Sequence, residues 1–523
     1  MHRGVVWMCL LLCGSLCAAQ VAVTTYHNDN YRSGSNTQEV SLTPTSVSQQ
    51  TFGRVNVFPV TGYVYAQPLY VPNVVIGGVS HNVVFIATEH DQVYAFDART
   101  GAQLWHTSLL RSPSALMLVT PVSSSDVNCG DLVPEIGITG TPVIDTANST
   151  MYLVAKYKVQ DLTTHTTTFH QQIHGLSLQN GIERQPPREI SATYPGTGGG
   201  SQGGVLTFDP LVEAQRTGLM LLNGKVYVSW ASHCDGGNYH GWLMAFTEGT
   251  LALSKVYVDT PNGYEGGFWG SGAAPAADSS GSVYSTSGNG DFSANSGGSD
   301  YGDSVVRLNP TQLTVSDYFT PWDQQTLDDN DSDFGSGGTL LLPDQAGGSH
   351  PHLLIQVGKE GTIDLIDRDN MGHWQSGSDS QIVQTMPYAI GGLWSSPAFW
   401  NNSVYFGGYN DELKAYAFNP QTQLLSTGPT SQSPEEFYFP GPTPSITSNG
   451  TNNGIAWVIQ GDGTYAVLRA YSATNLGNEL YNSEQNSGRD RAGLPVKFTV
   501  PTVADGHVFV GTQNQVAEYG LLQ

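Results

Sequence analysis

Short runs of apolar or alternating residues dominate the chain, and residues that favour turns separate them. Gly, Asn, Asp and Pro fill the separating positions, as strands joined by tight turns require. No segment has the periodicity of an amphipathic helix of useful length. The pattern therefore predicts an all-β protein. The clearest predicted strands cover residues 83–87, 151–155, 226–230, 353–357, 404–407, 455–459 and 507–511.

These runs recur in one repeating unit. A unit opens with a strand of small residues and Pro, such as 140–143, and an apolar strand follows. A third strand then ends in an aromatic or aliphatic residue and a polar turn, as at 93–97. Eight such units lie roughly 50–80 residues apart, which is the spacing expected for the four-stranded blades of a β-propeller.

The two ends of the chain complement one another. The eighth unit runs out at Gln523 before a fourth strand can form, and the segment 51–58 can supply that strand. Pairing the two would close the ring and leave no open sheet edge. We therefore expect a single eight-bladed β-propeller of four-stranded antiparallel blades, closed by N- and C-terminal strands. A seven-bladed ring is the alternative, because the third unit is irregular.

The first 19 residues have the form of a secretion signal. Arg3 supplies a positive charge, residues 5–12 are apolar, and residues 17–19 are small ones that suit a cleavage site. The apolar run is too short to span a bilayer, and no later run reaches about 18 apolar residues. We expect a signal peptide over 1–19, a propeller over 20–523, and a secreted or periplasmic protein.

The composition of the chain restricts the kinds of partner that it is expected to bind. The net charge is −24, which argues against nucleic acid or an anionic membrane surface and favours cations, or only solubility. We expect a monomer whose partner is an envelope or extracellular protein, or a small hydroxylated ligand. Two cysteines follow the signal, Cys129 and Cys234. An exported protein permits a disulfide between them, and two buried free thiols are equally open.

One stretch is specific to a known family. Residues 95–105 read A-x-D-x-x-T-G-x-x-x-W and resemble the tryptophan-docking motif of the quinoprotein alcohol dehydrogenase family. In that motif the Asp and Thr-Gly make a turn, and Trp105 would pack flat against the neighbouring blade. The resemblance covers most of the chain and implies a propeller built of pyrroloquinoline-quinone (PQQ) repeats.

The resemblance also implies candidate site residues. Trp269 lies in a segment similar to the one that stacks under the quinone ring, and Asn289 lies in a turn similar to one that ligates calcium. Asp331 falls near the position of the catalytic base, and Lys359 near that of the basic residue that contacts the quinone oxygens. The candidate metal ligands are Asn289, Asp331 and Asp333.

Such a set has coherent chemistry. Ca²⁺ takes amide and carboxylate oxygens and acts as a Lewis acid on a quinone carbonyl. A carboxylate such as Asp331 removes the proton of a substrate hydroxyl. A flat aromatic such as Trp269 holds the cofactor, and Lys359 stabilises developing charge.

The chain also departs from the family. It has no adjacent Cys-Cys pair, no clear counterpart of the calcium-ligating Glu, and no C-x-x-C-H segment for a c-type haem. Each candidate also has a structural interpretation: Trp269 as a core aromatic, Asn289 as a turn residue, the segment 328–333 as an acidic turn, and Lys359 as a strand-end lysine.

Three functions follow from these observations. The departures favour a non-catalytic binding or scaffold protein in the periplasm or outside the cell. The alternative is a calcium- and PQQ-dependent dehydrogenase acting on an alcohol or sugar. The third is a carbohydrate-binding propeller.

Overall fold

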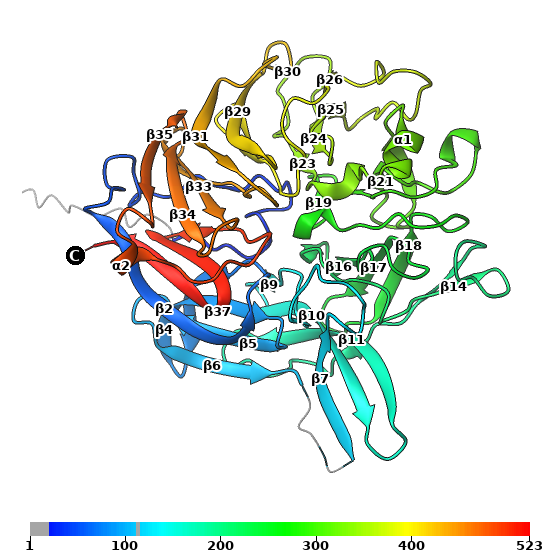
Figure 1. Ribbon diagram of the computed structural model, residues 1–523, viewed down its shortest axis with the longest axis horizontal. Coiled ribbons are helices and arrows are strands. Elements are labelled where there is room, and N and C mark those ends of the chain that lie inside the picture. The colour runs from blue at the N-terminus through cyan, green and yellow to red at the C-terminus, as the bar shows by residue number, and fades with distance from the viewer. Residues whose placement is uncertain (1–19, 111–113, 115, 523) are drawn as a thin grey trace, which may run out of the picture.

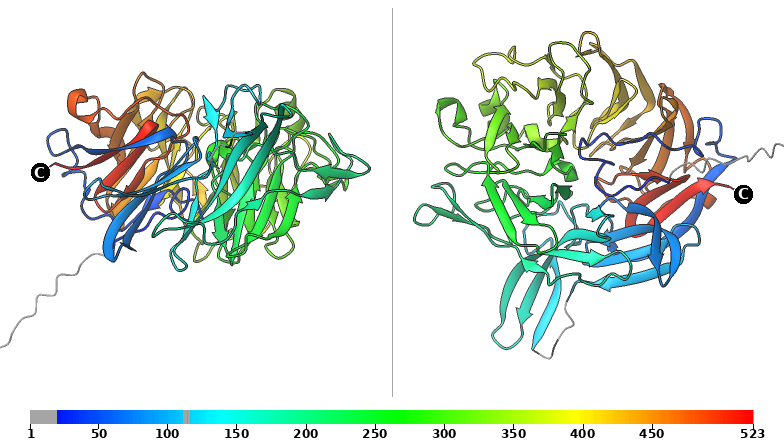
Figure 2. Two further views of the ribbon diagram at one scale, coloured as in Figure 1. Left: turned by 90° about the horizontal axis from the view of Figure 1, so that it is seen from below. Right: turned by 180° about the vertical axis from the view of Figure 1, so that it is seen from behind.

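The computed structural model describes residues 20–110, 114 and 116–522, and the predicted signal peptide lies outside them. Within these residues most elements are strands, and the strands pair into small, mainly antiparallel sheets. The sheets stand side by side around a common centre (Figure 1), and the molecule is flatter when seen from the side (Figure 2). This arrangement is a β-propeller.

In most of the sheets, strands that follow one another in sequence are neighbours. The first sheet comprises β3 (Leu69–Ile76), β4 (Val79–Thr88), β5 (Gln92–Asp97) and β6 (Gln103–Ser108). The second comprises β9 (Val143–Asp145), β10 (Thr150–Asp161), β11 (Thr166–Ser177) and β12 (Arg188–Glu189), with β7 (Met117–Ser123) paired to β10 and β8 (Glu135–Ile136) paired to β7. The third comprises β15 (Met220–Leu222), β16 (Lys225–Ser229), β17 (Trp242–Thr247) and β18 (Leu253–Val258).

Four further sheets follow along the chain. They are β19 (Ala276–Ala277), β20 (Val283–Thr286), β21 (Val305–Leu308) and β22 (Val315–Phe319); β23 (Leu340–Leu341), β24 (Leu353–Val357), β25 (Ile363–Asp367) and β26 (Gln384–Met386); β27 (Ala398–Trp400), β28 (Ser403–Gly407) and β29 (Asp411–Asn419), with β30 (Leu424–Leu425) and β31 (Ser431–Phe437) both on β29; and β32 (Ser445–Asn449), β33 (Asn452–Gln460), β34 (Val467–Ser472) and β35 (Asn475–Asn482), with β1 (Ser35–Asn36) on β32.

Strands from the two ends of the chain form the last sheet. β2 (Phe52–Tyr63) pairs with β37 (His507–Leu521), which also pairs with β36 (Thr502–Ala504). Figure 1 shows the blue β2 beside the red β37. The predicted closing strand is therefore confirmed, and the sheet that it completes joins the N-terminal part of the chain to the C-terminal part.

A few short elements lie outside this repeating pattern. The sequence pattern predicted no helix, and helices this short depend on contacts with the rest of the protein because they have little stability of their own. The short helices are α1 (Gln324–Asp329), α2 (Ser487–Asp490), η1 (Gly270–Gly272), η2 (Ala294–Ser296) and η3 (Phe334–Ser336). A separate hairpin is formed by β13 (Thr193–Pro195) and β14 (Val205–Thr207).

Trp105 docks as its motif predicts. Its indole nitrogen donates to the carbonyl of Leu178, just beyond β11 in the next sheet, at 2.9 Å. Gly181 makes room for the ring: its φ is 67°, and a Cβ there would lie 2.6 Å from an indole carbon. The turn before Trp105 is held by Asp97, which accepts the backbone N–H of Thr100 at 2.7 Å. The motif thus ties one sheet to the next.

The core lies between adjacent sheets. One cluster combines Tyr152 and Val154 of β10 with Trp230, just beyond β16, and Trp242 of β17, and both of these tryptophans are fully buried. Apolar burial of this kind supplies most of the stabilisation of such sheets. The loops at the strand ends are therefore free to carry polar groups.

Candidate functional site

A pocket of about 430 Å³ opens where loops of many sheets converge, and we call it the axial pocket. Several of its residues stand a few positions before the first strand of a sheet: Arg216 before β15, Trp269 before β19, Asp333 before β23, Trp394 before β27 and Phe498 before β36. Side chains from so many sheets can meet only near the centre of the ring. Equivalent positions of successive repeating units therefore line a single cavity.

Four of the five candidate residues line this pocket, and Asn289 contacts one of them, Asp333. The ammonium of Lys359 lies 2.6 Å from Oδ1 of Asp331 and also pairs with Asp333. The indole nitrogen of Trp269 donates to Oδ1 of Asp333 at 3.4 Å, and the backbone N–H of Asn289 donates to the same oxygen at 3.0 Å. Residues separated by up to 90 positions thus form one cluster around the carboxylate of Asp333.

The two aspartates of this cluster differ in burial. The side chain of Asp331 is 64% exposed and that of Asp333 only 6%. Burial raises the pKa of Asp333, and the ammonium of Lys359 partly offsets this. Burial acts to lower the pKa of Lys359, but the two carboxylates raise it above its usual value. The sequence singled out Asp331 as the candidate base, whereas the carboxylate at the centre of the contacts is that of Asp333.

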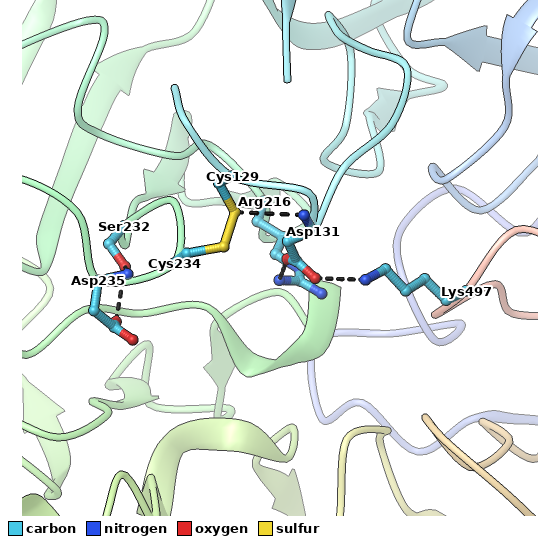
Figure 3. The surroundings of a disulfide bond; sticks show 7 residues. All are labelled: Cys129, Asp131, Arg216, Ser232, Cys234, Asp235 and Lys497. Carbon is cyan, nitrogen blue, oxygen red and sulfur yellow. Dashed lines mark hydrogen bonds and ion pairs between the residues drawn. A yellow bond between two sulfur atoms is a disulfide. The ribbon is translucent and has the colours of Figure 1, made fainter. Parts of the chain in front are cut away.

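A second charged group lies beside a disulfide (Figure 3). Cys129 and Cys234 are bonded, with their Cα atoms 5.7 Å apart. Asp131 pairs with Arg216 at 2.5 Å and with Lys497 at 2.6 Å. Although burial acts to raise the pKa of Asp131, these two cations lower it to about 2. Asp131 is therefore a firmly ionised carboxylate.

Aromatic rings form one wall of the axial pocket. Phe439 lies edge-on to Trp394, with centroids 5.7 Å apart, and edge-on to Phe498 at 6.1 Å. We call Trp394, Phe439 and Phe498 the aromatic wall. Sequence reasoning missed these three residues and also Arg216. Their place shortly before the first strand of a sheet was the signal that could have found them.

In this cluster the ammonium group of Lys359 takes the place between the carboxylates that a calcium ion would need. Calcium needs several oxygen ligands, but Lys359 already contacts both Asp331 and Asp333. With its amide nitrogen turned toward Asp333, Asn289 donates to Oδ2 at 3.1 Å and offers no oxygen there. Among the described residues no three His, Cys, Asp or Glu side chains are placed to hold a metal ion. The arrangement as it stands does not fit calcium.

The indole of Trp269 already contacts two cationic side chains. The Cζ atom of Arg216 lies 5.2 Å from its ring centroid, and the Nζ atom of Lys359 lies 5.8 Å from it. A quinone ring stacked on Trp269 would compete with these cations for the indole. Accommodating PQQ would therefore require the side chains around Trp269 to move.

Comparison with known proteins defines the fold and no more. No protein-family model matches the chain, and no curated protein matches its sequence. Among solved structures it is similar to the quinohemoprotein alcohol dehydrogenase from Comamonas testosteroni, with a TM-score of 0.61 and 14% identity over 97% of this chain and 81% of that one. It is also similar to a europium-containing methanol dehydrogenase, with a TM-score of 0.58 and 12% identity over 96% of this chain and 98% of that one.

These likenesses support the propeller of the quinoprotein type that the tryptophan-docking motif implied. At such identities they do not carry the chemistry of those enzymes to this chain. In the part of the chain that the structure covers, no helix is long and apolar enough to cross a membrane.

Proposed function

We propose that the protein is a non-catalytic binding propeller that works in the periplasm or outside the cell, and that its axial pocket takes a small hydroxylated ligand. The export part of this proposal rests on the signal-like sequence of residues 1–19. The ligand part rests on one observation, the composition of the axial pocket.

That composition combines internally paired charges with exposed aromatic surface. Arg216 is paired with Asp131, and Lys359 with Asp331 and Asp333, so neither cation is left over for an acidic ligand. Carboxylate oxygens at the rim can accept hydrogen bonds from hydroxyl groups. The aromatic wall offers apolar ring surface in the pocket, against which the apolar face of a sugar ring can pack. A neutral, polyhydroxylated molecule suits this combination.

A PQQ-dependent dehydrogenase acting on an alcohol or sugar is the second candidate. The observation that favours it is the cluster of Trp269, Asn289, Asp333 and Lys359, which the family resemblance implied. The contacts of Lys359 with both carboxylates oppose it, because they occupy the space and the charge that calcium would need.

Calorimetry on the mature chain from Gln20, stripped of metals, separates the candidates. We expect saturable binding of a neutral oligosaccharide, weakened at least about tenfold by Trp394→Ala, because an indole face contributes much of such a contact. Tyr264→Ala is the matched control, since Tyr264 is an exposed aromatic that does not line the pocket. PQQ should give no binding with or without Ca²⁺.

Two other outcomes of this experiment would contradict the proposal. Tight PQQ binding that needs Ca²⁺, and that drops in Asn289→Ala and Asp331→Ala, would establish the dehydrogenase site and overturn the proposal. A chain that binds neither sugar nor PQQ would contradict the ligand part of the proposal, and pull-down from envelope extracts would then test a scaffold role.

We also propose that the sheets beginning with β3, β9, β15, β19, β23, β27 and β32, together with the sheet of β2, β36 and β37, are eight blades of one domain over residues 20–523. A monomer is expected. Its mass in solution, measured by light scattering, tests whether the protein is a monomer.

A further inference from the structure

A second cavity, of about 330 Å³, lies beside the axial pocket, and we call it the lateral cavity. The two cavities share two stretches of chain as a common wall. In the segment 331–334 the odd-numbered residues line the axial pocket and the even-numbered residues line the lateral cavity. In 358–360 only Lys359 faces the axial pocket. The lateral cavity is therefore a separate space with its own chemistry.

The charge of the lateral cavity has one sign. Its lining includes the carboxyl groups of Asp323, Glu360, Asp364 and Asp379, and it includes no Lys, Arg or His. Asp364 is only 2% exposed, and its Oδ1 atom has no hydrogen-bond partner anywhere in the described part of the chain. A buried carboxylate oxygen without a partner is costly, because folding has removed its water. The cavity thus lacks a positive group.

Two exposed aromatic rings accompany these carboxyl groups. Trp322 is 45% exposed and Tyr388 is 71% exposed, and both line the lateral cavity. The backbone N–H of Trp322 donates to Oδ1 of Asp379 at 2.8 Å, so the indole is anchored beside a carboxylate. Aromatic faces attract cations, and exposed apolar surface beside a cavity marks binding sites.

The carboxyl groups resist ionisation while no cation is present. Burial raises the pKa of Asp364 well above its usual range, and the charges of Asp379 and Asp323 add to this while the nearby Thr385 hydroxyl opposes it. Burial, with a contribution from Asp323, raises the pKa of Asp379 to about 6. Burial, again with Asp323, raises that of Glu360. A bound positive charge would reverse these shifts.

We propose that the lateral cavity binds an organic cation. An ammonium or guanidinium group would lie against Asp364 and Asp379, and the carbon-bearing part of the ligand would lie against Trp322 and Tyr388. An inorganic cation would use the carboxylates but has no apolar part to pack against the rings. A neutral sugar would not supply the positive charge that the lining of the cavity lacks. This inference is independent of the function assigned to the axial pocket.

Titrations of the mature chain with choline and with arginine amide test the proposal. The neutral isostere of choline, 3,3-dimethyl-1-butanol, measures what the charge contributes. At pH 7.5 we expect both cations to bind saturably and the isostere to bind at least about tenfold more weakly. The variants Trp322→Ala and Tyr388→Ala should each weaken choline binding several-fold, and since both residues are exposed these variants should fold. Asp364→Asn should weaken it further.

Matched controls are Tyr264→Ala and Asp369→Asn, because both residues are exposed and lie outside the lateral cavity. Both should bind choline as the unaltered protein does. Lowering the pH from 7.5 to 5 should weaken binding, because Asp379, whose pKa burial raises to about 6, then takes up a proton. No saturable binding of either cation, equal binding of the isostere, or displacement of choline by micromolar Ca²⁺ would each overturn the proposal.

Discussion

The guanidinium carbon of Arg216 lies 5.2 Å from the centroid of the Trp269 indole ring. The same guanidinium pairs with Asp131 at 2.5 Å and lies 4.2 Å from the centroid of Phe498. Arg216 therefore connects the charged group beside the disulfide, the Trp269 cluster and the aromatic wall. It is one of the side chains that line the axial pocket, and it contacts all three of these groups.

Replacing Arg216 with Met keeps most of the side-chain volume and removes the charge. We expect the free energy of unfolding to fall by about 3 kcal/mol, because Asp131 loses one of its two partners in a largely buried place. Urea denaturation measures the change. Arg491→Met is the control, since Arg491 forms an exposed ion pair with Glu484 and such pairs contribute little. A loss no greater than that of the control would contradict the role given to Arg216.

The stability of the protein should depend on pH through Glu89. This side chain is fully buried, and burial raises its pKa to about 8, while the N–H of Gly137 and the hydroxyl of Thr139 act to lower it. The unfolded chain releases this proton near pH 4.5 and the folded protein only near pH 8. The contribution of Glu89 to stability is thus fully present below about pH 4.5 and is lost as the pH rises to 8.

The variant Glu89→Gln removes this titration while keeping the shape of the protonated side chain. Relative to the unaltered protein, it should gain several kcal/mol of stability between pH 5 and pH 8, at up to about 1.4 kcal/mol per pH unit. Urea denaturation at pH 5, 6, 7 and 8 gives the difference. Glu436→Gln, at an exposed position, should leave the pH dependence unchanged. A difference that does not grow with pH would show that Glu89 is already ionised.

Much of the fold could be predicted from the sequence because strand-forming patterns are local. All seven strands predicted from apolar runs lie in or overlap strands of the structure; for example, residues 353–357 coincide with β24 and residues 455–459 lie within β33. Trp105 was predictable for a similar reason, since its motif is contiguous. The short helices were not, because helices of this length depend on contacts with the rest of the protein. The β13–β14 hairpin was not either, because its strands are only three residues long and carry no clear strand pattern.

The site was predictable only in part. Resemblance to a family singled out Trp269, Asn289, Asp333 and Lys359, and these residues do meet. It did not show that Lys359 would contact both aspartates, because the direction of a side chain follows from the packing of several loops. Asp131, Arg216 and the aromatic wall lie in loops where no contiguous motif marks them, and the packing of several sheets around one centre brings them together.

The disulfide between Cys129 and Cys234 should contribute strongly to stability. The two residues are 105 positions apart, so the bond restricts a long loop in the unfolded chain. Removing it in the double variant Cys129→Ser, Cys234→Ser should lower the free energy of unfolding by about 4 kcal/mol. Denaturation with and without reductant measures this. Alkylation of both cysteines in the native, unreduced protein, detected by mass spectrometry, would contradict the bond.

Closure of the ring predicts a sensitive position at Phe52. This residue begins β2, lies opposite Leu521 at the end of β37, and is fully buried. Its ring packs edge-on against Tyr481, with centroids 5.0 Å apart, and lies 5.4 Å from Trp457 of the neighbouring sheet. The side chain therefore holds the strand from the N-terminal part of the chain against the neighbouring sheet of β32 to β35, which comes from the C-terminal part.

Phe52→Ala should lower the free energy of unfolding by about 4 kcal/mol, because it leaves a cavity among these rings. Val55→Ala is the matched control on the same strand, since Val55 is 45% exposed and should cost less than about 1 kcal/mol. If closure holds the whole ring together, Phe52→Ala should also speed proteolysis near both ends of the chain. A loss of stability like that of Val55→Ala would show that β2 contributes little to closure, and that the ring is held by its other sheets alone.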